Sequence, residues 1–365
     1  MLFFKMVSVL YLRYFFIILI TLSGFMLGFD LLSNGETLPK SANLLIIYGV
    51  YKWLYAVDMM TPISLIFGFI ATIVELIRSN ALTSFYALGY SRLKVLSPIL
   101  TVVVTLLVGY IGVHATSFAR ANEYADNLRQ SSEFLTPTNN LFFTHEGNYL
   151  YFGTLNPLSQ EAHDIRLFTF EKGKLKETLS ADNAYYANHY WNIQHAHIIT
   201  PPPTMDLKGG GITIRNVQNV KVLKDFRPKI LDQIYEGKVN YTIMDALDAL
   251  HLLKSQNVDL SKVKSSLYRN FITPWFALVM IILIYGYVPI GSRFANLSLY
   301  SFGAILVTLL VWGVLFAAGE LANNKTLSPE VGIVAPILFL TLLSTLHLSS
   351  FWIKSRLNLR QKGVA

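Results

Sequence analysis

Three histidines in the middle of the chain, His189, His195 and His197, are the residues whose types and spacing most resemble a metal site. Side chains alternate between the two faces of a strand, so His195 and His197 would share one face, a spacing compatible with zinc. A solvated strand face has the same pattern, and no carboxylate follows at a fixed spacing. We therefore expect no metal site and leave the role of these histidines open.

The motifs of common nucleotide-binding and hydrolytic enzymes are absent from the sequence. There is no G-x-x-x-x-G-K-[ST] phosphate-binding loop, and the one glycine-rich run, Lys208 to Gly211, opens no predicted helix. Neither an H-E-x-x-H helix nor a G-x-S-x-G turn occurs. The chain has no cysteine, which excludes disulfides and thiolate metal sites. We expect a non-catalytic protein that holds no cofactor itself.

Two carboxylates fall in or beside long apolar runs. Asp58 lies inside one run and Glu320 ends another. A charge at the centre of a bilayer costs at least about 2.5 to 3.5 kcal/mol, so such residues usually face a polar interior between helices. For Asp58 the alternative is an interfacial carboxylate paired with a neighbour such as Lys52.

The composition is that of a membrane protein. Hydrophobic residues make up 53% of the chain, charged residues 14%, and the mean hydropathy is +0.44. This is more apolar than soluble chains of similar length. The net charge of +8 fits cytoplasmic loops and anionic lipid better than nucleic acid, because no basic module with interleaved aromatic residues is present.

Apolar segments long enough to cross a bilayer, which takes about 20 residues of helix, occur six times. They are Tyr14 to Leu32, Val50 to Ile77, Val95 to Phe118, Asn270 to Ile290, Leu297 to Gly319 and Pro329 to Trp352. Lys5 and Arg13 before the first segment would suit a signal peptide. That run is long, however, and no small-residue cleavage pattern follows it, so we interpret it as a true span.

Lysine and arginine in short loops indicate the cytoplasmic side. With six spans, the basic groups of the short loops and termini all fall on one side: Lys5 and Arg13; Arg78, Arg92 and Lys94; Arg293; Lys354, Arg356, Arg360 and Lys362. Both termini are therefore predicted to be cytoplasmic, and the large region between spans three and four to be exported.

Further basic residues run against this trend because they fall at the outer ends of spans: Lys40, Lys52, Arg120 and Arg269. Lysine and arginine bind phosphate strongly through charge-assisted hydrogen bonds, so these four are candidates for binding an anionic lipid. The alternative is ordinary snorkelling of long side chains at the interface.

The exported region, 121–265, has the alternation of strands in 141–155, 164–179 and 184–199, with turn residues at 145–148 and 171–174. This pattern predicts an all-β sandwich or open barrel, followed by a helix that begins near Thr242. The predicted organisation is three spans in 1–120, the β domain in 121–265 and three spans in 266–365.

The connection between spans two and three, 79–90, is longer than the usual helix connection of about 2 to 8 residues. Ser79 or Asn80 can cap a helix, apolar residues recur at helical spacing, and Gly89 suits a C-terminal end. We expect a short amphipathic helix on the cytoplasmic surface. It is either a surface-anchored connector or a docking element for a partner.

The stretch SNALTSFYALGYSRLKVL resembles the S-E-L-T-V-L-x-A-x-G-x-S-R segment of the lipopolysaccharide-export permeases, the LptF/LptG family. The resemblance extends over nearly the whole chain, and DLLSNGETLPK is closer to LptG than to LptF. Other matching stretches are FFTHEGNYLYFGTL, ADNAYYANHYWNI, RNFITPWFALVMI, YGYVPIGSRFANLSLYSFG and LSPEVGIVAPILFLTLLS.

The resemblance implies an α+β protein of the bacterial inner membrane, with six spans (3+3) around a periplasmic jellyroll-like domain. It implies the permease subunit of an ABC-type transporter that extracts lipopolysaccharide and passes it to a periplasmic bridge toward the outer membrane. The implied partners are an LptB-like ATPase dimer, an LptF-like permease and a bitopic LptC-like protein. ATP and magnesium would be bound by the ATPase, not by this chain.

The resemblance also implies that the short helix docks in a groove of the ATPase. The residues we expect at this contact are Arg78, Ala81, Leu82, Phe85, Leu88, Gly89 and Arg92. Ala81 stands where the family has Glu, so apolar packing would have to replace the expected charge contact.

The β domain would receive the lipid, and aromatic residues of its strands are candidates for the lining: Phe143, Tyr149, Tyr151, Phe168 and Phe170. Their alternate spacing fits an ordinary sandwich core equally well. The alternative function is an ABC-type mechanotransmission subunit resembling FtsX or MacB. Such subunits have four spans with the outside domain after the first, whereas here three spans precede it.

Overall fold

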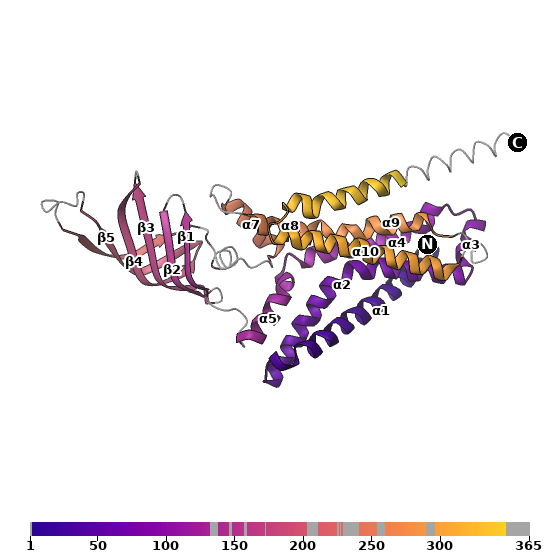
Figure 1. Ribbon diagram of the computed structural model, residues 1–365, viewed down its shortest axis with the longest axis horizontal. Helices are drawn as coiled ribbons and strands as arrows, with labels where there is room; N and C mark the ends of the chain where they lie inside the picture. Colours follow the sequence, from indigo (N-terminus) through magenta and orange to yellow (C-terminus); the bar gives the residue numbers. More distant parts are fainter. Residues whose placement is uncertain are drawn as a thin grey trace. The chain divides into compact units, whose positions relative to one another are not determined.

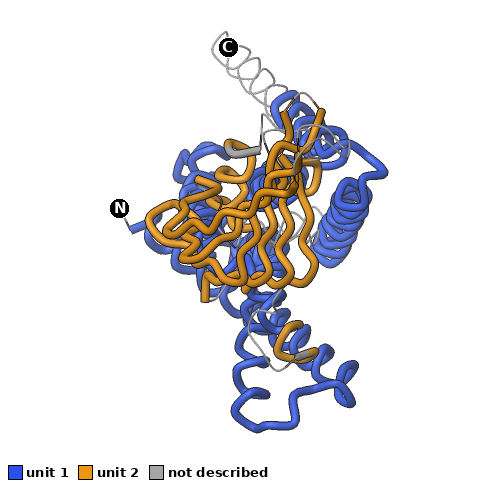
Figure 2. The backbone as a smooth tube through the Cα atoms, turned by 90° about the vertical axis from the view of Figure 1, so that its left-hand side faces the viewer, with its two compact units in different colours: residues 1–125, 264–365 blue, residues 126–263 orange. Residues whose placement is uncertain are grey.

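The computed structural model describes residues 2–131, 138–145, 148–156, 159–171, 173–202, 211–224, 226, 228, 241–253, 260–289 and 296–347. Arg293, residues 208–210 of the glycine-rich run and the basic C-terminal tail lie outside the described residues. The chain divides into two compact units, one of Met1–Ala125 with Lys264–Ala365 and one of Asp126–Val263 (Figure 2).

The first unit is helical (Figure 1). In chain order its elements are α1 (Leu2–Ser33), η1 (Gly35–Thr37), α2 (Ala42–Arg78), α3 (Ala81–Ala87), α4 (Arg92–Val113), η2 (Ser117–Arg120), the start of α5 (Ala121–Ser131), most of α8 (Ser261–Phe271), η3 (Thr273–Trp275), α9 (Phe276–Gly286), α10 (Leu297–Asn323) and η4 (Glu330–Val334), a π-helical turn. The turn η4 opens a helix that continues to His347.

The prediction of six spans is confirmed. The described residues hold six helices long and apolar enough to cross a membrane: α1, α2, α4, α8 with α9, α10, and Glu330–His347. The helices begin or end several residues away from the predicted segments. The third ends at Val113 rather than Phe118, and the first already begins at Leu2, before the basic residues Lys5 and Arg13.

Helix α2 is the central helix of this unit. In its most apolar window 72% of the residues are buried, against 17% in α1 and in α10. A Cβ atom at Gly68 of α2 would lie 3.0 Å from the Cα atom of Phe15 in α1, so glycine allows the two backbones to approach closely. Tyr11 of α1 donates a hydrogen bond to the Leu65 carbonyl, 3.1 Å away. One face each of α1 and α10 is left for lipid or a partner.

The second unit contains one antiparallel sheet in chain order, β1-β2-β3-β4-β5-β6. The strands are β1 (Thr138–His145), β2 (Asn148–Asn156), β3 (Glu161–Glu171), β4 (Lys174–Ala187), β5 (Tyr190–Thr200) and β6 (Thr213–Val222), and α7 (Ile243–Leu253) follows them. Thr242 accepts a hydrogen bond from the Asp245 backbone N–H and caps α7, which confirms the predicted helix.

One face of the sheet is buried, and Trp191 is its largest side chain. The Trp191 ring contacts Phe152, and its Nε1 donates a hydrogen bond to the Phe226 carbonyl at 2.8 Å. The described strands form one up-and-down sheet, which matches an open sheet better than the two facing sheets of a sandwich or jellyroll. The predicted turn at 171–174 is confirmed, with Gly173 at φ +78°.

Candidate functional site

Helix α3 is the short helix predicted between spans two and three, and it is shorter than 79–90. Ser79 belongs to the end of α2, where its hydroxyl donates to the Glu75 carbonyl at 2.8 Å. Asn80 precedes α3 in a left-handed conformation, φ +59°, and makes no side-chain capping bond. Gly89 has φ +83° and terminates the helix, as predicted, because glycine adopts this conformation without steric cost.

The inner face of α3 packs on the helices that surround it. Leu82 is fully buried in the helical core. The ring of Phe85 lies 4.7 Å from that of Phe3 in α1, edge to face. Tyr86 and Tyr285 of α9 form a hydroxyl–hydroxyl bond at 3.3 Å, and Tyr285 donates to the Arg92 carbonyl at the start of α4 at 2.7 Å. A displacement of α3 would therefore act on α1, α4 and α9 together.

The expected docking residues thus fall on different sides of α3. Leu82 and Phe85 point inward, whereas Leu88 is 74% exposed and Arg78 and Gly89 are also exposed. Ala81 and Arg92 are half-buried. The structure leaves Leu88 as the large apolar side chain of this set that a partner can reach. ATPase docking by these residues stays a prediction.

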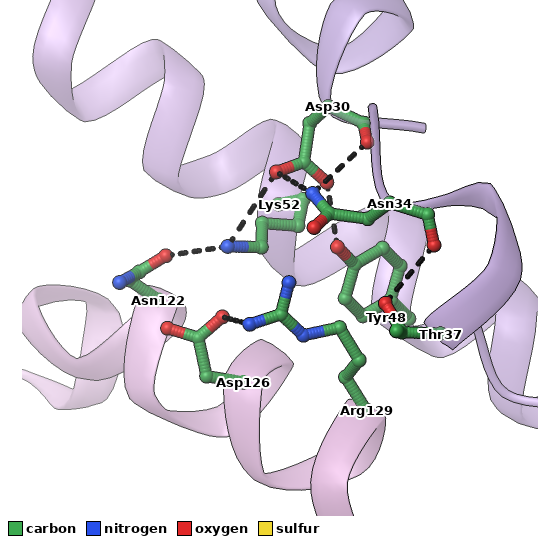
Figure 3. Close-up of polar contacts among 8 residues, drawn as sticks. All are labelled: Asp30, Asn34, Thr37, Tyr48, Lys52, Asn122, Asp126 and Arg129. Carbon is green, nitrogen blue, oxygen red and sulfur yellow. Dashed lines mark hydrogen bonds and ion pairs between the residues drawn. The ribbon is translucent and has the colours of Figure 1, made fainter. Parts of the chain in front are cut away.

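Lys52, one of the expected lipid-binding residues, is buried in a polar cluster between α1, α2 and α5 (Figure 3). Its Nζ lies 3.7 Å from the Asp30 carboxylate and donates to the Asn122 side-chain oxygen at 2.8 Å. Tyr48, one turn before Lys52, donates to the other oxygen of Asp30 at 2.5 Å. Asp30 is the residue that sequence reasoning missed here, since it ends an apolar helix.

The other three expected lipid-binding residues differ in exposure. Lys40 is exposed, Arg120 is 2% exposed, and Arg269 forms an ion pair with Glu320 at 3.9 Å. Of the four, Lys40 alone is fully open to a ligand without rearrangement. Lipid binding by this set stays a prediction.

Asp58 is paired with His114, and not with Lys52, the neighbour named in the alternative interpretation of this carboxylate. His114 follows the last residue of α4, and its Nε2 lies 2.9 Å from Oδ1 of Asp58. The Tyr110 hydroxyl is 2.6 Å from the same oxygen and 3.1 Å from the Asp58 carbonyl. That carbonyl lacks its usual helical donor, because the residue four positions later is Pro62. The single Tyr110 hydroxyl proton is shared between these two oxygens, with the carboxylate oxygen nearer, so it replaces in part the donor that the proline removes.

The two ring nitrogens of His114 both face acceptors. Nδ1 lies 2.9 Å from the Tyr110 carbonyl, which can only accept, so Nδ1 carries a proton. Burial lowers the pKa of His114, but the hydrogen bond to Asp58 and its negative charge outweigh burial and raise the pKa above the ordinary 6.5. The positive charge of Arg269 lowers the pKa of His114. The imidazolium is therefore favoured beside the carboxylate.

The expected lining residues of the β domain lie on both faces of the sheet. Phe143 is buried and stacks near Phe152 and Phe226. Tyr149 is opposite Phe168 in the register and contacts Phe170, and it is 40% exposed. Tyr151 also belongs to this second face, since it alternates with the buried Leu150 and Phe152. The buried face and the aromatic second face are separate surfaces.

The three histidines are spread over the β4–β5 turn and β5. His197 Nδ1 lies 2.7 Å from the Asn216 side-chain oxygen of β6. Within the described part of the chain, no three side chains of His, Asp or Glu are grouped as metal ligands.

A family model described as "Lipopolysaccharide export system permease LptF/LptG" matches residues 7–351. No curated protein matches the chain. Residues 7–351 include α3, the polar groups around Lys52 and around Asp58, and the six-stranded sheet.

Proposed function

The chain belongs to the LptF/LptG family of lipopolysaccharide export permeases, and from this membership we propose that it is the membrane subunit of an ATP-driven extractor of lipopolysaccharide. It is a multi-pass protein of the inner membrane and a permease subunit rather than an enzyme. In our proposal both termini and α3 face the cytoplasm, the sheet is periplasmic, and an LptB-like ATPase dimer, a second permease and an LptC-like protein complete the transporter. We propose the LptG branch, on the stretch DLLSNGETLPK.

The observation that best supports this proposal is that α3 packs on other helices along one side and ends in an exposed apolar residue. Phe85 contacts Phe3 of α1, Tyr86 is hydrogen-bonded to Tyr285 of α9, and Tyr285 in turn donates to the Arg92 carbonyl of α4. Leu88, which follows α3 as its C-terminal cap, is exposed. A short helix of this kind can receive a push from an ATPase and pass it to several spans at once. Work is required because each CH₂ of an acyl chain leaving hydrocarbon costs about 0.8 kcal/mol.

The mechanotransmission alternative is less well supported. It would place the outside domain after the first span, whereas three membrane helices precede the sheet here and three follow it. The matched family also covers nearly the whole chain.

Two substitutions test the proposal, one at the exposed residue that caps α3 and one on the inner face of α3. Leu88→Asp should reduce ATPase binding about tenfold or more, because it places a charge in an apolar contact. Phe85→Ala should leave ATPase binding intact but uncouple ATP hydrolysis from lipopolysaccharide extraction in reconstituted vesicles, since it removes the contact with Phe3.

Leu93→Asp is the matched control, because Leu93 is an exposed leucine outside α3. Unchanged extraction in both α3 variants would refute a coupling role for this helix. Reduced ATPase binding in the Leu93 variant to the same degree would show that the effect is not specific to α3.

A further inference from the structure

An open groove of about 530 Å³ lies beside α3, between the beginning of α1 and the end of α2. Its volume is within the range of about 300 to 1,000 Å³ that is usual for ligand sites. One side is a single face of α1, with Leu2, Met6, Val9 and Leu10 at helical spacing. Ala81, the first residue of α3, is part of the wall.

Two basic residues, Lys5 and Arg13, lie on the same face of α1 and also line the groove. Both are exposed, and within the described residues neither side chain forms a hydrogen bond or an ion pair. Glu75 of α2 lines the opposite side, so the local charge is two positive against one negative. The groove therefore combines mostly apolar walls with an excess of positive charge.

The residues Lys5 and Arg13 are eight positions apart, about 12 Å along the helix axis. Both belong to a helix that is apolar enough to span the membrane. Long basic side chains in such a position extend toward the headgroups while their stems contact apolar groups. An amphiphile that lays an acyl chain against the apolar walls and carries an anionic phosphate would match the walls and the cations at once.

We infer that this groove binds an anionic phospholipid of the cytoplasmic leaflet, with its phosphate at Lys5, the Arg13 side chain extended toward that phosphate, and one acyl chain along Met6, Val9 and Leu10. The placement in that leaflet rests on the orientation in the proposed function. Because Ala81 forms part of the wall, a bound lipid supports the start of α3 and makes the coupling helix sensitive to the surrounding lipid.

Lipid retention on the purified full-length permease tests the inference. The protein is exchanged into nanodiscs of phosphatidylcholine with a minor share of phosphatidylglycerol, and retained lipid is counted by native mass spectrometry. The Lys5→Gln, Arg13→Gln double variant should retain about tenfold less phosphatidylglycerol, because two charge-assisted hydrogen bonds are lost. The Lys94→Gln control changes an exposed lysine that does not line the groove and should have no effect. The Lys5→Arg, Arg13→Lys variant keeps both charges and should retain the lipid.

Equal retention of phosphatidylglycerol by the parent and the double variant would overturn the inference. A photo-crosslinker at Met6 provides the second measurement, made on the permease assembled with its ATPase in the same nanodiscs: crosslinks to phosphatidylglycerol support the inference, whereas crosslinks to the ATPase alone would assign the groove to protein docking and overturn it. Neither measurement needs lipopolysaccharide extraction. Failure of the proposed export function would therefore appear in the Leu88 and Phe85 variants without changing lipid retention.

Discussion

His114 and Asp58 connect α2 and the end of α4 through a short, largely buried contact. The His114 side chain is 2% exposed and that of Asp58 is 24% exposed. Tyr110 adds a hydroxyl donor to the same carboxylate oxygen. The contact explains how a carboxylate is accommodated inside a membrane helix: it is hydrogen-bonded and paired with a cation rather than left alone.

The raised pKa of His114 predicts a pH dependence of stability. A histidine whose pKa is higher in the folded than in the unfolded chain stabilises the fold fully below the unfolded pKa, near 6.5. This stabilisation is lost as the pH rises through the folded pKa. The detergent-solubilised protein should therefore unfold at a lower temperature at alkaline pH, as measured in thermal melts across that range.

His114→Gln should lower stability by about 1 to 3 kcal/mol at acidic pH and reduce the pH slope, because it leaves a carboxylate with a weaker partner. The control is His251→Gln, which changes an exposed histidine. An unchanged slope in the His114 variant would assign the pH dependence to other groups.

Lys52 shows how a residue type can suggest one role and its surroundings another. A lysine at the end of a span is well placed to bind a phosphate. The ammonium group of Lys52, however, already contacts Asp30 and Asn122. Freeing it would leave the Asp30 carboxylate with a weaker set of partners. Lys40, which is exposed, is the simpler candidate for a lipid headgroup.

At the scale of elements, the contact between α1 and α2 includes one glycine and one tyrosine at close approach. Gly68 lies against the Phe15 backbone, and Tyr11 reaches the Leu65 carbonyl. The Phe15 backbone cannot move aside as a flexible side chain can, so a side chain added at Gly68 must push α1 and α2 apart. Since α1 also carries Phe3, which contacts α3, this separation would affect coupling as well.

Gly68→Val should destabilise the protein by about 1 to 3 kcal/mol, as is usual for overpacking. Gly49→Ala, also in α2, is the matched control, because a Cβ atom there meets nothing within 4 Å. It should be neutral or stabilising by up to about 1 kcal/mol, since alanine is the better helix former. Thermal melts of both variants make the comparison, and equal stability of the two would contradict close packing at Gly68.

At the scale of the whole molecule, the helical unit leaves the apolar faces of α1 and α10 open. Phe16 and Phe25 of α1 and Leu310 and Val314 of α10 are each about half to three-quarters exposed. Apolar faces of this extent suit lipid or another membrane helix. They are the surfaces at which a second permease would complete the transporter that we propose.

The absence of cysteine from the chain makes this surface testable by crosslinking. Val314→Cys in α10 should form a disulfide-linked pair with a suitably placed cysteine in the second permease, because Val314 is 67% exposed. Ile73→Cys, fully buried in α2, should not. Absence of crosslinking at Val314 would exclude this face of α10 as the interface.

The sequence by itself determined the six membrane helices, the strand-rich region between them, the capped α7 and the glycine that ends α3. These features depend on local hydropathy, on periodicity and on backbone conformations that particular residues favour. The family resemblance was also carried by local stretches. The family match over residues 7–351 then confirmed it.

Only the tertiary structure decided which residues meet. Asp58 and His114 are 56 positions apart, and Tyr86 and Tyr285 are 199 apart. Such pairings depend on helix crossing angles and rotations that no local pattern encodes. For the same reason the structure separated the inner Leu82 and Phe85 from the outer Leu88, and it showed one sheet in chain order where strand alternation alone allowed either a sandwich or an open barrel.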